Sequence, residues 1–152
     1  MRGRGRVICA LAVGWLAVGF AAAAYAFATS EAGDAPDGPL GPGSAGITLN
    51  VNHSRFTPDR VVVREGTTVT FTIVNDDPIG HELIVGDAEV HRLHESGTHG
   101  RHSDVSGEVS VAPGKSATTT YTFDTPGTVL FACHLPGHFA YGMVGEVIVK
   151  ES

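Results

Sequence analysis

Short segments of alternating apolar and polar residues fill the chain between residues 47 and 150, and they restrict its fold more than any other feature. Val69, Phe71 and Ile73 alternate with threonines, and the segment 117–123 repeats this pattern. Alternation with a period of two predicts strands that are buried on one face. Eight strands are expected, at residues 47–51, 60–64, 68–75, 81–85, 108–111, 117–123, 128–133 and 145–150.

Turn residues separate these segments, and no long stretch has helical periodicity. Pro113-Gly114 and Pro126-Gly127 suit the two central positions of a type II turn. Short alternating strands joined by regular turns predict an all-β fold, an antiparallel sandwich or barrel in which each sheet buries one face. Residues 86–107 are the exception, because this polar, histidine-rich segment is too long for a hairpin turn.

The first 28 residues predict an export signal. Three arginines precede an uncharged stretch of 22 residues, 7–28, which ends in small-x-small patterns. This arrangement indicates a removable signal peptide, but about 20 apolar residues also suffice for an uncleaved membrane anchor. Positive charge keeps the N-terminus in the cytoplasm in both cases. We therefore expect a periplasmic or extracellular protein, secreted or anchored only through this segment.

A flexible linker rich in Gly, Pro and Ala is expected at residues 29–46, because such a composition cannot bury enough apolar surface to offset the entropy of ordering. Residues 47–152 then form a single domain. Beyond residue 28, seven basic residues face sixteen acidic ones, a formal net charge of −9. This acidic balance argues against nucleic acid as a partner.

A candidate metal site lies where the predicted strand 128–133 ends. Cys133 is the one cysteine beyond the leader, so a disulfide within the exported part is excluded. A free thiol in an oxidising compartment needs a reason to persist, and metal ligation supplies one. His138 and Met143 follow in the pattern Cys-x4-His-x4-Met, so one loop could turn all three side chains toward a common point. His81, directly after "NDDPIG", is the candidate fourth ligand.

Two imidazoles, one thiolate and one weakly bound thioether form the ligand set of a type 1 copper site. Taken singly, each of these residues is more often an ordinary core or surface residue. Their coincidence at strand ends of an exported β-domain favours the metal site. The sequence therefore predicts one type 1 copper ion, held by His81, Cys133, His138 and Met143.

At these residues the chain resembles the cupredoxin family of type 1 blue copper proteins, which includes plastocyanin and azurin. The resemblance rests on "NDDPIGHEL" and "CHLPGHFAYGMVG", whose ligand spacing is like that of rusticyanin and auracyanin, and it extends over most of residues 47–150. It implies a Greek-key β-sandwich and one-electron transfer without substrate turnover, so we expect no enzyme. Glu82 departs from the family pattern, because Asn or Ser often follows the first histidine; its carboxylate could face solvent or tune the site.

The segment 86–107 carries four further histidines in pairs spaced i, i+3: His91, His94, His99 and His102. This spacing lets neighbours share a metal if the segment is helical or folds back. The alternative is a solvated loop whose histidines never converge. A second site would bind Cu(II), Zn(II) or both and would suit copper buffering. We expect His134 and His53 to be non-ligating.

Three functions compete for this chain. We rank first an electron carrier between redox partners, and second a copper-binding protein for tolerance, buffering or delivery that uses the histidine-rich loop. A copper oxidase or reductase ranks third. A multicopper oxidase would need further His-x-His clusters, which the sequence lacks. Apolar residues around His138, with Ile79 on the opposing loop, predict a face where redox partner proteins dock. We expect a monomer.

Overall fold

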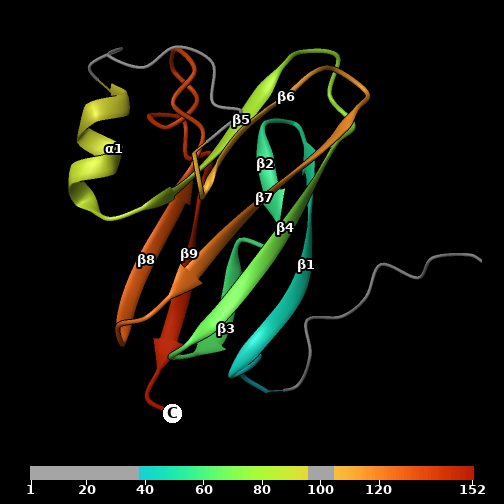
Figure 1. The fold of residues 1–152 in the computed structure, drawn as a ribbon. Helices are drawn as coiled ribbons and strands as arrows, with labels where there is room; N and C mark the ends of the chain where they lie inside the picture. The colour runs from blue at the N-terminus through green and yellow to red at the C-terminus, as the bar shows by residue number, and fades with distance from the viewer. Residues whose placement is uncertain (1–37, 96–104) are drawn as a thin grey trace, which may run out of the picture. The chain divides into compact units, whose positions relative to one another are not determined.

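The computed structural model describes residues 38–95 and 105–152, which form two β-sheets packed face to face (Figure 1). The strands are β1 (Gly43–Asn52), β2 (Arg55–Thr57), β3 (Arg60–Arg64), β4 (Thr67–Asn75), β5 (His81–Gly86), β6 (Glu108–Val111), β7 (Ser116–Phe123), β8 (Gly127–Ala132) and β9 (Val144–Lys150). One sheet has the order β2-β1-β4-β7 and the other the order β3-β9-β8-β5-β6. The predicted leader, 1–28, and the linker up to residue 37 lie outside the described residues.

Alternating burial creates the core between the sheets, as the sequence predicted. In β4 the side chains of Val69, Phe71 and Ile73 are fully buried, while the threonines between them are partly or fully exposed. Phe131 of β8 meets Phe71 across the sandwich and also packs edge-on against Phe56, with ring centroids 6.4 and 5.4 Å apart. The predicted all-β sandwich is confirmed, with β2 as a short additional strand.

The expectation of purely antiparallel sheets is wrong. β1 runs parallel to β4, and β3 runs parallel to β9, whereas the other strand pairs of the described residues are antiparallel. No hairpin joins β1 to β4, because the chain crosses to the other sheet and forms β3 between them. A period-two pattern reveals which face of a strand is buried, but it carries no information about the direction of the neighbouring strand.

The folded domain begins earlier than predicted. β1 starts at Gly43 rather than at residue 47. Before it, the Leu40 N–H donates to the Val62 carbonyl at 2.9 Å, and the Leu40 carbonyl accepts the Arg64 N–H at 2.7 Å. The end of the predicted linker is therefore ordered by backbone hydrogen bonds, which do not need the large apolar side chains that mark a strand in the sequence.

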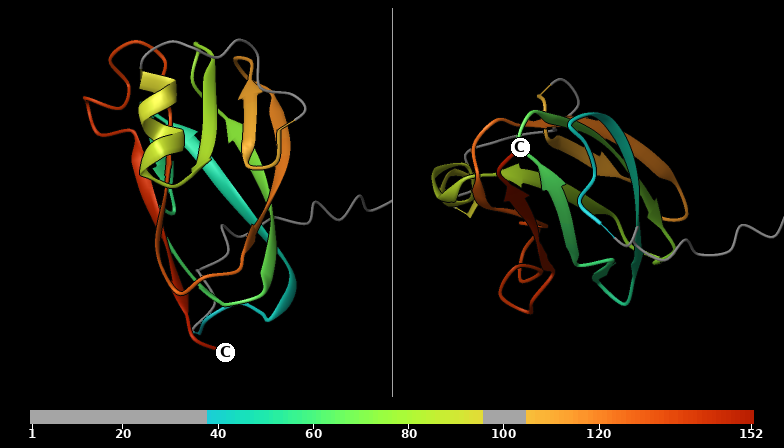
Figure 2. Two further views of the ribbon diagram at one scale, coloured as in Figure 1. Left: turned by 60° about the vertical axis from the view of Figure 1, so that its left-hand side comes forward. Right: turned by 90° about the horizontal axis from the view of Figure 1, so that it is seen from below.

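A helix, α1 (Ala88–Glu95), forms in the polar segment 86–107, for which the sequence left both a helix and a solvated loop open. Asp87 caps its start, because Asp87 Oδ1 accepts the N–H groups of Glu89 and Val90 at 3.0 Å each. A Cβ at Gly86 would overlap Val90, so the glycine lets the helix follow β5 directly. α1 lies beside the five-stranded sheet (Figure 2). The helix has only eight residues, and most of them are polar, so the sequence shows no apolar pattern with helical periodicity.

Different segments of the chain meet at the two ends of the sandwich. At one end the loop after β4 meets the turn after β6, where the Asn75 N–H donates to the Lys115 carbonyl at 2.9 Å. At the other end the start of β1 lies near the chain's C-terminus, since the Gly43 N–H donates to Gly66 and the Glu65 N–H to Lys150. β4 separates these ends by about 30 Å, the length of a nine-residue strand. The metal-ligand candidates lie at the first end.

Gly145→Ala should destabilise the sandwich. A Cβ at Gly145 would overlap the Phe131 ring and the Asp59 carbonyl. We expect the free energy of unfolding, measured by denaturant titration, to fall by about 1–3 kcal/mol, the usual cost of overpacking. Gly46→Ala is the matched control, because a Cβ there meets nothing within 4 Å. An equal loss in both variants would contradict the packing at Gly145.

Candidate metal centre

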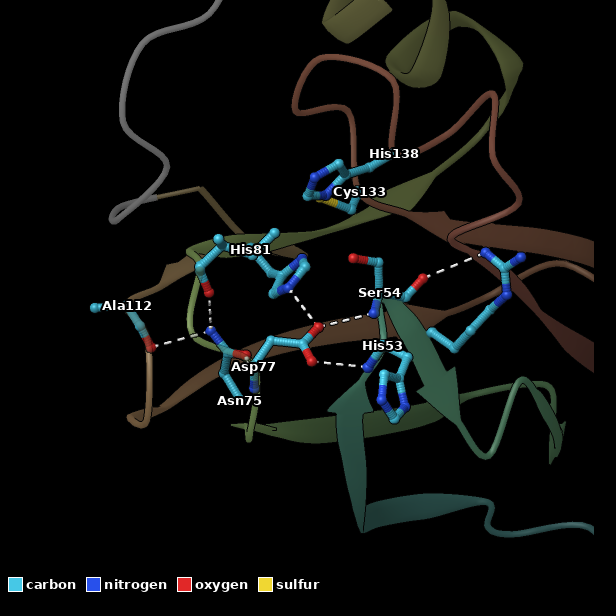
Figure 3. A network of polar contacts seen from close by, with 10 residues as sticks. His53, Ser54, Asn75, Asp77, His81, Ala112, Cys133 and His138 are labelled. Atoms are coloured by element: carbon cyan, nitrogen blue, oxygen red, sulfur yellow. Dashed lines mark hydrogen bonds and ion pairs between the residues drawn. The ribbon is translucent and has the colours of Figure 1, made fainter.

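Three of the four predicted ligands come together at one end of the sandwich. One ligand atom each of His81, Cys133 and His138 lies within 4.8 Å of the other two (Figure 3). The Cys133 Sγ is 3.2 Å from the His138 Nδ1, and the two imidazole centroids are 5.0 Å apart. Cys133 and His81 are buried, and His138 is partly exposed. This is a compact group of one sulfur and two nitrogen donors, near enough to share one metal ion.

The β8–β9 ladder positions Cys133 and Met143. Regular pairing ends at Ala132 and Val144, and the Cys133 N–H then donates to the Met143 carbonyl at 3.1 Å. The Met143 N–H donates in turn to the His138 carbonyl at 2.9 Å. The Met143 side chain is fully buried. The fourth predicted ligand is thus joined through its backbone to two of the other three.

Asp77 holds His81 in place, and the sequence analysis missed it. Asp77 Oδ2 lies 3.0 Å from His81 Nε2. The same carboxylate accepts the N–H groups of His53 at 2.7 Å and Ser54 at 2.8 Å, from the turn between β1 and β2. The His53 side chain is exposed and lies outside the ligand group. The sequence Asn-Asp-Asp-Pro at residues 75–78 could have pointed to Asp77, because Asn and Asp side chains often form hydrogen bonds with the backbone of turns.

The other ring nitrogen of His81, Nδ1, is buried and has no hydrogen-bond partner among the described residues. Leaving such a nitrogen unpaired is costly, so it calls for an explanation. Burial lowers the pKa of His81, although the hydrogen bond to Asp77 acts in the opposite direction. The ring is therefore neutral at pH 7, with a lone pair on Nδ1, which is the form that binds a metal.

The surroundings of Cys133 also fit a metal. Burial raises the pKa of the Cys133 thiol to about 11, and backbone hydrogen bonds offset only part of this effect. Without a metal the residue is therefore a thiol at neutral pH. A metal binds the thiolate, so loading the site must release this proton.

Glu82 is buried in the protein, so the first of the two alternatives for this residue, a carboxylate that faces solvent, is excluded. The residue is 7% exposed. Its Oε1 accepts the backbone N–H of His134 at 2.9 Å, so it links β5 to the residue that follows Cys133. Through this hydrogen bond, Glu82 holds the start of the loop that carries Cys133, His138 and Met143.

Two of the additional histidines pack against the ligand loop. His91 Nε2 lies 3.3 Å from the Leu130 carbonyl, which can only accept, so His91 Nδ1 accepts from His134 Nε2 at 2.8 Å. His94 Nε2 lies 3.4 Å from Glu108 Oε2. Burial, followed by repulsion from the two neighbouring histidines, lowers the pKa of His134 to about 4. These rings are therefore engaged with protein groups around α1.

The four-histidine second site stays a prediction. His91 and His94 are both buried on α1, as their i, i+3 spacing allows. Within residues 38–95 and 105–152, neither belongs to a group of three candidate ligands as compact as the one around Cys133. His99 and His102 lie outside the described residues. His134 lies outside the group of His81, Cys133 and His138.

The apolar residues of the ligand loop divide into two sets. Leu135 packs against the core. Phe139 is partly buried and stacks on His134, with ring centroids 4.9 Å apart. Tyr141 on the same loop is 79% exposed, and Ile79 on the opposing loop is 47% exposed. Only part of the predicted docking face is therefore on the surface.

A family model described as copper binding proteins, plastocyanin/azurin family, matches residues 45–150. The chain belongs to this family. Its cofactor is copper, and the predicted resemblance to this family is confirmed. The chemistry of the buried Cys and His donors agrees with this metal, because soft thiolate and imidazole ligands suit copper.

Curated relatives of this cupredoxin are named copper-resistant cuproprotein CopI. The relative from Rubrivivax gelatinosus is 38% identical over 100 residues, which cover 63% of this chain and 60% of the relative. The relative from Pseudomonas aeruginosa is 31% identical over 140 residues, which cover 70% of this chain and 77% of the relative. The match thus spans three fifths of the length of the Rubrivivax protein.

Solved structures of auracyanins share the fold. The dithionite-reduced auracyanin of Roseiflexus castenholzii superimposes with a TM-score of 0.60 at 22% identity, covering 74% of this chain and 99% of the auracyanin. Auracyanin A of Chloroflexus aurantiacus, a "blue" copper protein, gives a TM-score of 0.57 at 21% identity, covering 70% and 99%. At these identities the likeness concerns the fold alone.

Cys133→Ser should remove the visible absorption of the copper-loaded cupredoxin. The intense band of the wild type is expected from charge transfer between the Cys133 thiolate and Cu(II), and serine offers no such donor. Circular dichroism should show a folded variant, because serine nearly matches cysteine in size. A serine variant that keeps the intense band would contradict Cys133 as the sulfur ligand.

Met143→Leu should leave copper bound and raise the reduction potential. A thioether in this position is a weak axial ligand that tunes the potential more than it holds the metal. Spectroelectrochemical titration measures the shift, and metal analysis measures the copper content. Complete loss of copper from the leucine variant would show that Met143 is a principal ligand instead.

Proposed function

We propose that this chain is an exported cupredoxin that binds copper for copper tolerance. The observation that carries the proposal is the compact ligand group of buried His81 and Cys133 and partly exposed His138, in which His81 Nδ1 has no protein partner among the described residues. The copper-resistance name of its relatives supports tolerance over the electron-carrier function that the sequence analysis ranked first.

The side chains would divide the binding between them. His81 and His138 would supply neutral imidazole nitrogens, Cys133 the thiolate and Met143 a weak thioether. Copper held there supplies a one-electron couple. The sandwich end keeps the ligands in one arrangement and excludes water from Cys133 and Met143, which are fully buried. We propose binding and redox chemistry without substrate turnover.

Electron transfer is the second candidate, and the exposed apolar side chains near the site favour it. Tyr141 and Ile79 extend from the two loops that flank the ligands. Exposed apolar groups beside a redox centre suit the small, weak interfaces of partners that must separate quickly. Redox partner proteins would dock there on a monomeric domain, with His138 between them and the copper.

Export is part of the proposal and rests on the N-terminal sequence. The three arginines and the uncharged stretch 7–28 suit a signal peptide or an anchor. Within the part of the chain that the structure describes, no helix combines the length and apolar character of a membrane span. From the N-terminal sequence we propose that the copper domain lies in the periplasm or at the extracellular face of the membrane.

Copper tolerance through the histidine-rich segment predicts more than one bound metal. Replacing His91, His94, His99 and His102 together should leave the visible band intact, because none of them is a proposed ligand of the centre. Equilibrium dialysis should then show one fewer bound metal ion than in the wild type. An unchanged stoichiometry would remove the second site and favour the electron carrier.

His53→Asn is the control for this experiment. His53 is exposed and has a positive φ of 51°, which asparagine tolerates well. This variant removes one histidine outside the segment, so it should keep the full stoichiometry. A loss of metal in the control would show that dialysis counts scattered surface histidines rather than a site.

A further inference from the structure

A strained turn cradles the Asp77 carboxylate. His53 and Ser54 both have positive φ, 51° and 53°, which is rare for residues other than glycine. Their two N–H groups converge on Asp77, at 2.7 Å from Oδ1 and 2.8 Å from Oδ2. Successive backbone N–H groups arranged in this way form a concave anion site. The turn between β1 and β2 is thus shaped to hold one negative charge.

The other side of Asp77 is equally fixed (Figure 3). The Asp77 N–H donates to Asn75 Oδ1 at 3.0 Å. The Asn75 amide in turn donates to the Ile79 carbonyl at 2.8 Å and the Ala112 carbonyl at 3.1 Å. The loop before His81 is therefore pinned, and the carboxylate that contacts His81 Nε2 at 3.0 Å has little freedom to move.

Both oxygens of the Asp77 carboxyl group accept hydrogen bonds, Oδ1 from the His53 N–H and Oδ2 from the Ser54 N–H. This is the arrangement of an ionised carboxylate, which can only accept. Oδ2 therefore also accepts from His81 Nε2, so Nε2 bears the proton and Nδ1 bears the lone pair. Hydrogen bonding of this kind raises the basicity of a ligating imidazole.

We propose that Asp77 is a positioning residue that acts through His81 to favour Cu(II) over Cu(I) at the copper centre. The proposal rests on the proposed function, because it takes His81 as a ligand through Nδ1. A more basic imidazole donates more electron density, which stabilises the higher charge of Cu(II) more than that of Cu(I). Asp77 would therefore bias the centre toward holding cupric copper, which deepens the role in copper tolerance.

Asp77→Asn tests the proposal against Asp76→Asn. Both substitutions remove one negative charge from the same loop, but the Asp76 side chain is exposed, and it is the backbone N–H of Asp76 that donates a hydrogen bond, to the Val51 carbonyl. Loss of such a partner typically weakens metal binding ten- to hundredfold. A loss confined to Cu(II) raises the reduction potential by about 59 to 118 mV, at about 59 mV per tenfold change for one electron. Asp76→Asn should shift it far less.

The copper-free protein supplies a readout that does not depend on the bound metal. Nitrogen-15 NMR of the histidine rings should show His81 protonated on Nε2 and not on Nδ1 in the wild type, and a mixture of both forms in Asp77→Asn. This measurement needs only the wild type if the variant fails to fold. Protonation on Nδ1 in the wild type would overturn the proposal.

The outcomes separate this inference from the proposed function. If copper-loaded Asp77→Asn keeps the intense visible band but has the same potential as Asp76→Asn, Asp77 does not act through His81 and the inference is overturned. If the wild type binds no copper and shows no visible band, the proposed function itself is wrong. A reduction potential that rises in Asp77→Asn but not in Asp76→Asn supports both the inference and the proposed function.

Discussion

The hydrogen bond from the Cys133 N–H to the Met143 carbonyl is the contact on which the candidate centre depends. It extends the β8–β9 ladder by one step and brings the two ends of the ligand loop side by side. β5 pairs with β8 on the other side, Ile84 opposite Ala132, so His81 reaches the same end of the sheet. His81, Cys133 and Met143 therefore lie at the ends of three adjacent strands, and His138 lies on the loop between β8 and β9. Backbone hydrogen bonds set the positions of these residues, and the Asp77 carboxylate also holds the His81 ring.

Much of this arrangement could be predicted from the sequence, because two kinds of pattern report directly on structure. Alternation in β4 identified a strand with one buried face. The Cys-x4-His-x4-Met spacing identified a loop between two strands. The position of His81, directly after a turn-rich segment, identified the ligand candidate that comes from a different strand. The structure brings His81, Cys133 and His138 together as the spacing implied. The strand predictions are confirmed, because a strand fixes where each successive side chain points.

Other features could not be predicted, because they depend on contacts between segments distant in the sequence. The carboxylates of Asp77 and Glu82 are in the polar string around His81, but their roles depend on backbone N–H groups at residues 53, 54 and 134. The parallel β1–β4 pairing arises from a crossing between sheets that no local pattern records. Helix α1 depends on one capping residue, Asp87, and a glycine that permits close approach.

The hydrogen bonds of Leu40 to β3 have a consequence for how the domain can be held. They fasten the incoming chain at the end of the sandwich where the C-terminus also lies. A support joined to residue 152 would therefore hold the domain by this end, with the metal end at the opposite end of the sandwich. A fusion partner joined at residue 152 would leave the metal end of the domain unobstructed. The domain is thus suited to oriented immobilisation, with its metal end directed toward the solution.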